Sequence, residues 1–117
     1  MRTIIAGSRK ITDYKTVLNA IRKSIEISGI RPTCIISGGA NGIDKLGEKF
    51  AKEFEFPLEI HNAEWDKYGN KAGFVRNEQM ALVSDALIAI WDGESKGTKH
   101  SIDLSTKYNK PCLIINF

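Results

Sequence analysis

The sequence of 117 residues has few of the residues that build cross-linked or metal-stabilised folds, with two cysteines, two histidines and three prolines. Cys34 and Cys112 both lie in apolar, strand-like runs, so we expect small core residues and no disulfide. The cysteines and histidines do not have the spacing of zinc ligands, and no metal site or cofactor is expected. His61 and His100 have no partner at a spacing that indicates catalysis.

Long hydrophobic runs are also absent. No apolar stretch approaches the roughly 18 residues that a membrane span requires. The chain passes from Met1 directly into a strand-like run, without the pattern of a signal peptide. We therefore expect a cytoplasmic protein with no membrane partner.

The composition is that of an ordinary globular protein, with 42% hydrophobic and 26% charged residues. This length suits one domain over residues 1–117. The net charge of +3 favours an anionic ligand, whereas a dedicated DNA-binding protein often carries a denser basic patch.

Strand-like and helical patterns alternate along the chain. Apolar runs predict strands at 3–6, 33–37, 57–61, 86–91 and 111–115. Helical periodicity predicts helices at 14–27, 44–54, 72–83 and 98–108. Because most of the strands are apolar on both faces, we expect a parallel sheet with helices on both sides, a three-layer α/β fold.

The segment 37–44, Ser-Gly-Gly-Ala-Asn-Gly-Ile-Asp, is the most informative motif. It joins a predicted strand to a predicted helix and contains three glycines within five residues. Glycines allow an anion to approach the backbone, and a helix start offers unpaired N–H groups. The segment predicts a phosphate cradle, although many strand–helix turns use glycine only for close packing.

Two further turns follow predicted strands, at 7–9 (Gly-Ser-Arg) and 93–98 (Gly-Glu-Ser-Lys-Gly-Thr). In an open α/β sheet these turns share the carboxyl edge, where ligands bind. We expect Arg9 to pair with phosphate, Thr98 to cap the following helix, and Asp92 to hold ribose hydroxyls. Neither turn has the ending of a Walker motif or the spacing of a dinucleotide fingerprint, which argues against conventional ATPase and NAD-dehydrogenase chemistry.

The segment between the third and fourth predicted strands adds polar candidates at the same edge. Arg76 and Asn77 lie near a helix start, and Asp44 and Glu78 supply carboxylates close to the expected pocket. Trp65 or Tyr68 is expected either to stack on a base or to pack within its own loop.

These motifs together with 76–80 (Arg-Asn-Glu-Gln-Met) and 92–100 resemble the SLOG superfamily, and more narrowly its YspA/YpsA-related branch of bacterial and phage genomes. The first two motifs also resemble the DNA-processing protein DprA, and the last resembles the loop of LOG-type phosphoribohydrolases. The resemblance implies a Rossmann-like fold with a five-stranded parallel sheet of order 3-2-1-4-5. It also implies a homo-oligomer, often a dimer, that binds a nucleotide or nucleotide-derived ligand.

The residues expected to bind this ligand lie in the loops at the carboxyl edge and on the helix near residue 76. They are Gly7, Ser8, Arg9, Ser37, Gly38, Gly39, Ala40, Asn41, Gly42, Asp44, Trp65, Arg76, Asn77, Asp92, Gly93, Lys96, Gly97 and Thr98.

Two alternatives to simple nucleotide binding remain. LOG enzymes pair an arginine with a glutamate three residues after the loop threonine, but here Ser101 stands at that position. A nucleotide N-glycosidase or phosphoribohydrolase would therefore have to use Arg76 with Glu78 or Asp44. The other alternative is DprA-like binding of single-stranded DNA, with cations supplied by Lys10, Lys71, Lys96 and Lys99.

Overall fold

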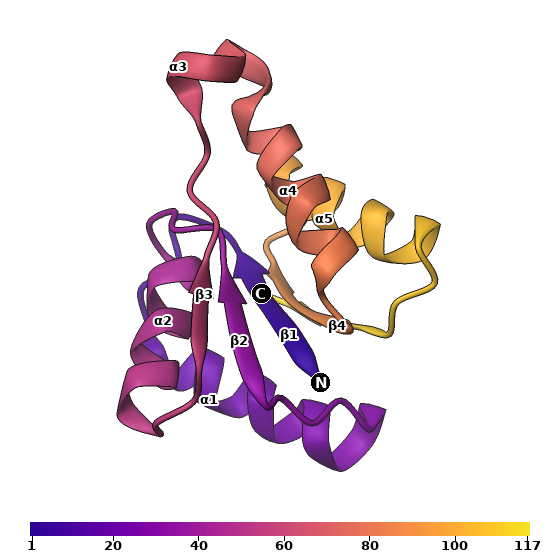
Figure 1. Ribbon diagram of the computed structural model, residues 1–117. Coiled ribbons are helices and arrows are strands. Elements are labelled where there is room, and N and C mark those ends of the chain that lie inside the picture. The colour runs from indigo at the N-terminus through magenta and orange to yellow at the C-terminus, as the bar shows by residue number, and fades with distance from the viewer.

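Five parallel strands form the middle layer of the computed structural model, which describes residues 1–117 (Figure 1). The strand order is β3-β2-β1-β4-β5, which confirms the order that the family resemblance implies. The elements in chain order are β1 (Arg2–Gly7), α1 (Tyr14–Lys23), η1 (Ser24–Ser28), β2 (Cys34–Ser37), α2 (Ile43–Glu53), β3 (Leu58–Ile60), α3 (Trp65–Tyr68), η2 (Gly69–Lys71), α4 (Ala72–Val83), β4 (Ala86–Trp91), α5 (Lys96–Lys107) and β5 (Cys112–Asn116).

The two faces of the sheet carry separate cores. On one face, α1 and α2 pack against the alternating side chains Ile5, Ile35 and Ile88. On the other face, α4 and α5 cover Ile4 and Leu87. β1 and β4 are buried on both sides, and apart from Arg2 and Thr3 at the start of β1 their residues are apolar or glycine, as expected for the centre of a parallel sheet.

Two local predictions were wrong in detail, and a third was correct. The helix predicted over 14–27 is α-helical only to Lys23 and then widens into the π-helical turn η1. The segment 65–71, expected to be a loop, forms the short helices α3 and η2, which project beyond the carboxyl edge (Figure 1). The third predicted helix, over 72–83, is α4 with the same bounds.

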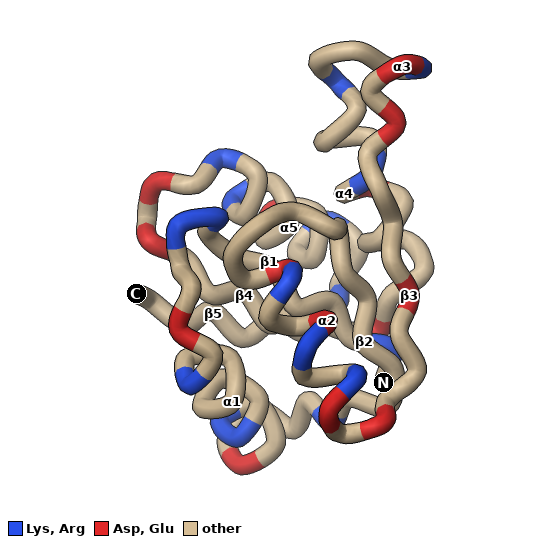
Figure 2. The backbone as a smooth tube through the Cα atoms, turned by 90° about the vertical axis from the view of Figure 1, so that its left-hand side faces the viewer, with Lys and Arg blue, Asp and Glu red and all other residues tan.

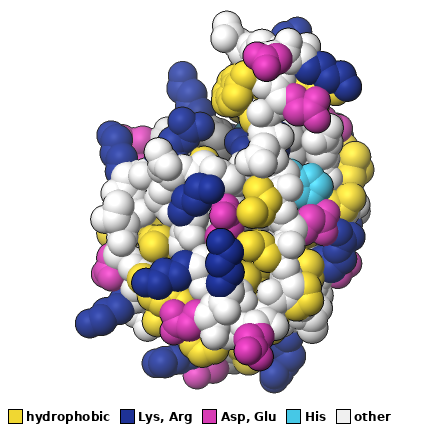
Figure 3. Space-filling view, turned by 60° about the vertical axis from the view of Figure 1, so that its left-hand side comes forward, with side chains coloured by type: hydrophobic (Ala, Val, Ile, Leu, Met, Phe, Trp, Pro, Cys, Tyr) yellow, Lys and Arg dark blue, Asp and Glu magenta, His cyan; other side chains and the backbone are white.

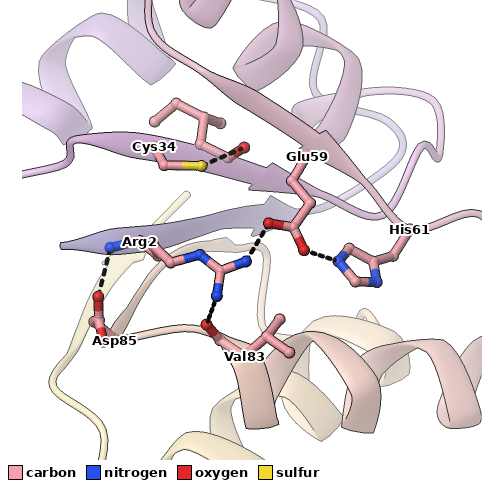
Figure 4. Close-up of polar contacts among 7 residues, drawn as sticks. Arg2, Cys34, Glu59, His61, Val83 and Asp85 are labelled. Atoms are coloured by element: carbon pink, nitrogen blue, oxygen red, sulfur yellow. Dashed lines mark hydrogen bonds and ion pairs between the residues drawn. The ribbon is translucent and has the colours of Figure 1, made fainter.

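A polar cluster links β1, β3 and the end of α4 (Figure 4). The Arg2 guanidinium pairs with Glu59 and donates to the carbonyl of Val83 at 2.7 Å. Glu59 also contacts His61 Nε2 at 2.7 Å, and the hydrogen bond from Arg2 is the main cause of the lowered pKa of Glu59. These contacts join the ends of β3 and α4 to β1 and so fix the position of α4 on the sheet.

Gly7 lies where β1, β4 and α2 approach one another most closely. A Cβ at this position would contact the carbonyl oxygen of Ile90 and lie 2.7 Å from Ile43 Cγ1. We expect Gly7→Ala to lower the free energy of unfolding by about 2 kcal/mol, because overpacked sites force backbone shifts. Urea denaturation of the purified variant measures this loss.

The matched control is Gly97→Ala, since a Cβ at Gly97 in α5 meets no atom within 4 Å. This variant should be neutral or gain up to about 1 kcal/mol from the higher helix propensity of alanine. Equal unfolding midpoints for the two variants would contradict the packing role of Gly7.

Candidate functional site

The strand-to-helix turns surround one cavity of about 380 Å³ at the carboxyl edge of the sheet. Its walls come from the ends of β1 and β4, the loop before α2, and the facing sides of α4 and α5. The residues that line it are Ala6, Gly7, Ser8, Arg9, Lys10, Ala40, Asp44, Arg76, Asn77, Met80, Asp92, Glu94, Ser95, Gly97, Thr98 and Ser101.

The loop before α2 lies directly on the turn after β1. Gly42 has φ = 76°, a left-handed conformation that favours glycine, and a Cβ there would lie 2.6 Å from the Cα of Arg9. The first helical amide, Ile43 N, donates to the carbonyl of Ser8 at 3.2 Å. The glycine therefore permits a backbone-to-backbone contact that joins two walls of the cavity.

The same loop uses several of its amides internally. Gly39 N donates to Ser37 Oγ at 3.1 Å, and Ala40 N donates to Asp44 Oδ2 at 3.2 Å. Ser37 Oγ in turn lies 2.7 Å from the buried carboxylate of Glu48. Because these amides have partners, the segment is a rigid wall and differs from the open cradle that its glycines suggest. Only Ala40 and Asp44 of this segment line the cavity.

Asp44 and Arg76 are held side by side. A Cβ on Gly38 would lie 2.8 Å from Asp44 Oδ2 and 2.9 Å from Arg76 Nη1. Arg76 Nη1 donates to the carbonyl of Gly38, and Arg76 Nε donates to Asn77 Oδ1 at 2.9 Å. The guanidinium is therefore fixed against the end of β2 before any ligand arrives.

Burial changes the protonation of both side chains. Asp44 is 7% exposed, and its burial raises its pKa to about 6, against the opposing effects of the Ala40 amide and the positive charge of Arg76. Burial also lowers the pKa of Arg76, while the neighbouring Asp44 carboxylate raises it. Asp44 is thus a carboxyl group that gains or loses its charge near pH 6.

The loop after β4 forms the opposite wall. Asp92 Oδ1 accepts from the amides of Glu94 and Ser95, each at 2.8 Å, and these hydrogen bonds lower the pKa of Asp92. Ser95 then caps α5, since its side chain accepts from Thr98 N and the helix begins at Lys96. The prediction that Thr98 is the cap was wrong, because Ser95 has the non-helical backbone of a capping residue. Thr98 is a buried residue inside the first turn.

Asn77 connects α4 to α5 at the base of the cavity. It is 6% exposed, and its Nδ2 lies 3.4 Å from the carbonyl of Gly97 and 3.2 Å from His100 Nδ1. Burial lowers the pKa of His100. Through these contacts the two helices keep Arg76 and Thr98 in fixed relative positions.

Several predicted site residues lie outside the cavity lining. Glu78 is exposed and accepts from the hydroxyl of Tyr108 at 2.8 Å, because it is two residues from Arg76 and so points to another side of α4. Trp65 is 54% exposed on α3 and lines a separate shallow depression with residues 63–67. The others outside the lining are Ser37, Gly38, Gly39, Asn41, Gly42, Gly93 and Lys96. A hydrolase mechanism would thus have Asp44 and not Glu78 beside Arg76.

Some lining residues had no role in the predicted ligand site: Ala6, Lys10, Met80, Glu94, Ser95 and Ser101. Helical spacing could have found two of these, since Met80 is four residues from Arg76 and Ser101 is three from Thr98. Ala6 and Glu94 could have been included as neighbours of the chosen turns, but their types carry no signal by themselves.

Charges of both signs occur around the cavity. Arg9, Lys10 and Arg76 face it together with the carboxylates of Asp44, Asp92 and Glu94. Figure 2 shows the same mixture of basic and acidic residues along the loops, and on the face in Figure 3 acidic side chains interrupt the basic ones.

No group of three or more His, Cys, Asp or Glu side chains is arranged to hold a metal ion. None of the helices is both long enough and apolar enough to span a membrane.

The sheet order and the position of the cavity define a Rossmann-like α/β protein. The family model of the YspA, cpYpsA-related SLOG family matches residues 1–68. The Gene 61 protein of Mycobacterium phage D29 is 33% identical over 122 residues, which cover 99% of this chain and 95% of that protein. The chain therefore belongs to the YspA, cpYpsA-related SLOG family.

A solved structure has the same fold. DNA processing protein A from Helicobacter pylori, described for its single-stranded DNA binding mode, matches with a TM-score of 0.67 and 21% sequence identity. The match covers 97% of this chain and 64% of that chain, so our chain spans less than two thirds of its structural neighbour.

The raised pKa of Asp44 predicts a pH-dependent stability. The folded protein holds the Asp44 proton more tightly than the unfolded chain does, with a pKa of about 6 against an ordinary 3.8. The resulting stabilisation is fully present below pH 3.8 and is lost as the pH rises through about 6. Relative to Asp44→Asn, which stays neutral, the wild type should lose about 2 kcal/mol between pH 4 and pH 7.

Urea denaturation of both proteins at several pH values in this range measures the difference. The asparagine retains a side-chain oxygen that can accept from the Ala40 amide. A constant difference across the range would show that Asp44 titrates normally in the folded protein.

Proposed function

We propose that the cavity binds a nucleotide or a nucleotide-derived ligand through its phosphate group. The observation that carries this proposal is the pair of guanidinium groups, Arg9 and Arg76, on the wall of one cavity without a salt-bridge partner. The ion pairs of the protein are Arg2–Glu59, Lys45–Glu48, His61–Glu59 and Lys99–Asp103. Arg9 and Arg76 form none of these ion pairs, and the single carboxylate of Asp44 beside Arg76 is opposed by burial. Two guanidinium groups on one wall therefore leave positive charge that favours a bound anion.

The donors that remain suit a phosphate. Arg76 has five N–H donors, of which Nε and Nη1 each already donate to the protein, so its Nη2 group remains for a ligand. Lys10 and the hydroxyl groups of Ser95 and Thr98 lie on the same cavity. The two hydroxyls share one hydrogen bond at 3.0 Å, so one of them keeps its O–H donor for a ligand. Since Asp92 uses Oδ1 for the two loop amides, Oδ2 is the oxygen that would accept from ribose hydroxyls.

Arg9→Ala tests this proposal with little risk to the fold, because Arg9 is exposed. We expect AMP to bind the wild type and to bind the variant about tenfold more weakly or worse, the effect of losing one charge-assisted contact. Isothermal titration calorimetry measures both affinities. Arg22→Ala, an exposed arginine in the last turn of α1, is the control and should bind AMP as the wild type does.

Two results would contradict the proposal. One is the absence of binding at millimolar concentration for every nucleotide tried. The other is an equal affinity for AMP in Arg9→Ala, Arg22→Ala and the wild type.

A second candidate function, binding of single-stranded DNA, is favoured by the projecting segment. Trp65 is 54% exposed on α3, and Lys67 and Lys71 are exposed within the same projection (Figure 1). Exposed aromatic rings beside cations suit base stacking along a phosphate backbone. The fold shared with the H. pylori protein supports this candidate.

For this second candidate, we expect fluorescence anisotropy to detect binding of labelled oligo-dT. The affinity should fall at least tenfold between about 50 and 200 mM salt, because phosphate contacts release counterions. Trp65→Ala should weaken binding about fivefold or more. The control is Phe54→Ala. Phe54 is an aromatic residue of similar exposure (52%), and it follows the C-terminal end of α2, the end away from the cavity. Salt-independent binding, or no binding at low salt, would exclude this candidate.

A further inference from the structure

The wall of the cavity contains no aromatic side chain. Its hydrophobic residues are Ala6, Ala40 and Met80, and all its other lining residues are polar, charged or glycine. Proteins that hold a nucleobase commonly stack it on an aromatic ring or an arginine plane. The aliphatic residues offer no such ring, and Arg76 is already held by its bonds to Gly38 and Asn77.

Asn77, the side chain best suited to recognise a base edge, already forms hydrogen bonds within the protein. Asn77 is the only carboxamide on the wall, and asparagine reads bases through its paired donor and acceptor. Here Oδ1 accepts from Arg76 Nε at 2.9 Å, and Nδ2 is directed to Gly97 and His100. With 6% of Asn77 exposed, it has neither the room nor the free groups to recognise a base.

The groups that remain match a sugar phosphate. Cations converge from the turn after β1 and from α4, and hydroxyl and carboxylate groups come from the loop after β4 and from α5. Trp65, the expected stacking residue, lines the separate depression on α3. The free polar side chains therefore suit phosphate and ribose, and no aromatic ring or free carboxamide is left for the base.

We propose that this cavity selects the ribose 5-phosphate part of its ligand and does not discriminate between bases. This inference rests on the proposed function, since it requires that a nucleotide occupies the cavity. The ligand class is that of 5′-phosphorylated ribosides of any base, with the base directed out of the cavity toward solvent.

Isothermal titration calorimetry with ribose 5-phosphate, AMP, GMP, CMP, UMP and adenosine tests this selectivity. We expect the four nucleotides and ribose 5-phosphate to bind within fivefold of one another, and adenosine to give no measurable binding. A Trp65→Ala variant should keep the AMP affinity of the wild type within the same factor.

The failures of the two proposals can be told apart. If none of the compounds binds, the proposed function fails. If the nucleotides bind but one base is preferred by more than fivefold, or ribose 5-phosphate is weaker by more than fivefold, the selectivity proposal is overturned and the nucleotide site remains. Binding of adenosine with the affinity of AMP, or a larger loss in Trp65→Ala, would also overturn it.

Discussion

The backbone contact between the turn after β1 and the start of α2 is the constraint on which the site depends. Gly42 lies against Ser8 and Arg9, and the Ile43 amide donates to the Ser8 carbonyl. Because Gly7 has no Cβ, Ile90 of β4 and Ile43 of α2 can approach the end of β1 closely. Because these approaches leave no space for a Cβ, main-chain packing sets the position of the Arg9 backbone relative to the start of α2.

This arrangement gives the glycine-rich loop a different role from the one its composition suggests. The amides of Gly39, Ala40 and Ile43 donate to Ser37, Asp44 and Ser8, so these three are satisfied without a ligand. Donors for an anion come instead from Arg9, Lys10 and Arg76. Buried polar groups need partners, and these three bonds hold the loop in place when the site is empty.

Asp44 is subject to opposing effects on its charge. The Asp44 carboxylate accepts a hydrogen bond from the Ala40 amide and lies beside Arg76, but burial disfavours its negative charge. An anion in the cavity would add a second negative charge near Asp44 and favour its protonated form. Ligand binding and protonation of Asp44 are therefore coupled in the proposed site. Glu78 cannot take part, because it is bonded to Tyr108 on another side of α4.

The sequence by itself determined the alternation of strands and helices, the parallel sheet, and the set of turns at its carboxyl edge. Motif resemblance added the strand order and the family. Periodicity and turn composition act over a few residues, so they locate elements and loops well. Only the tertiary structure decided that Asp44 lies beside Arg76 and that Ser95 caps α5. It also decided that the Asn77 carboxamide is already hydrogen-bonded within the protein. These facts depend on partners far apart in the chain, such as Arg76 with Gly38, and on which groups are removed from water.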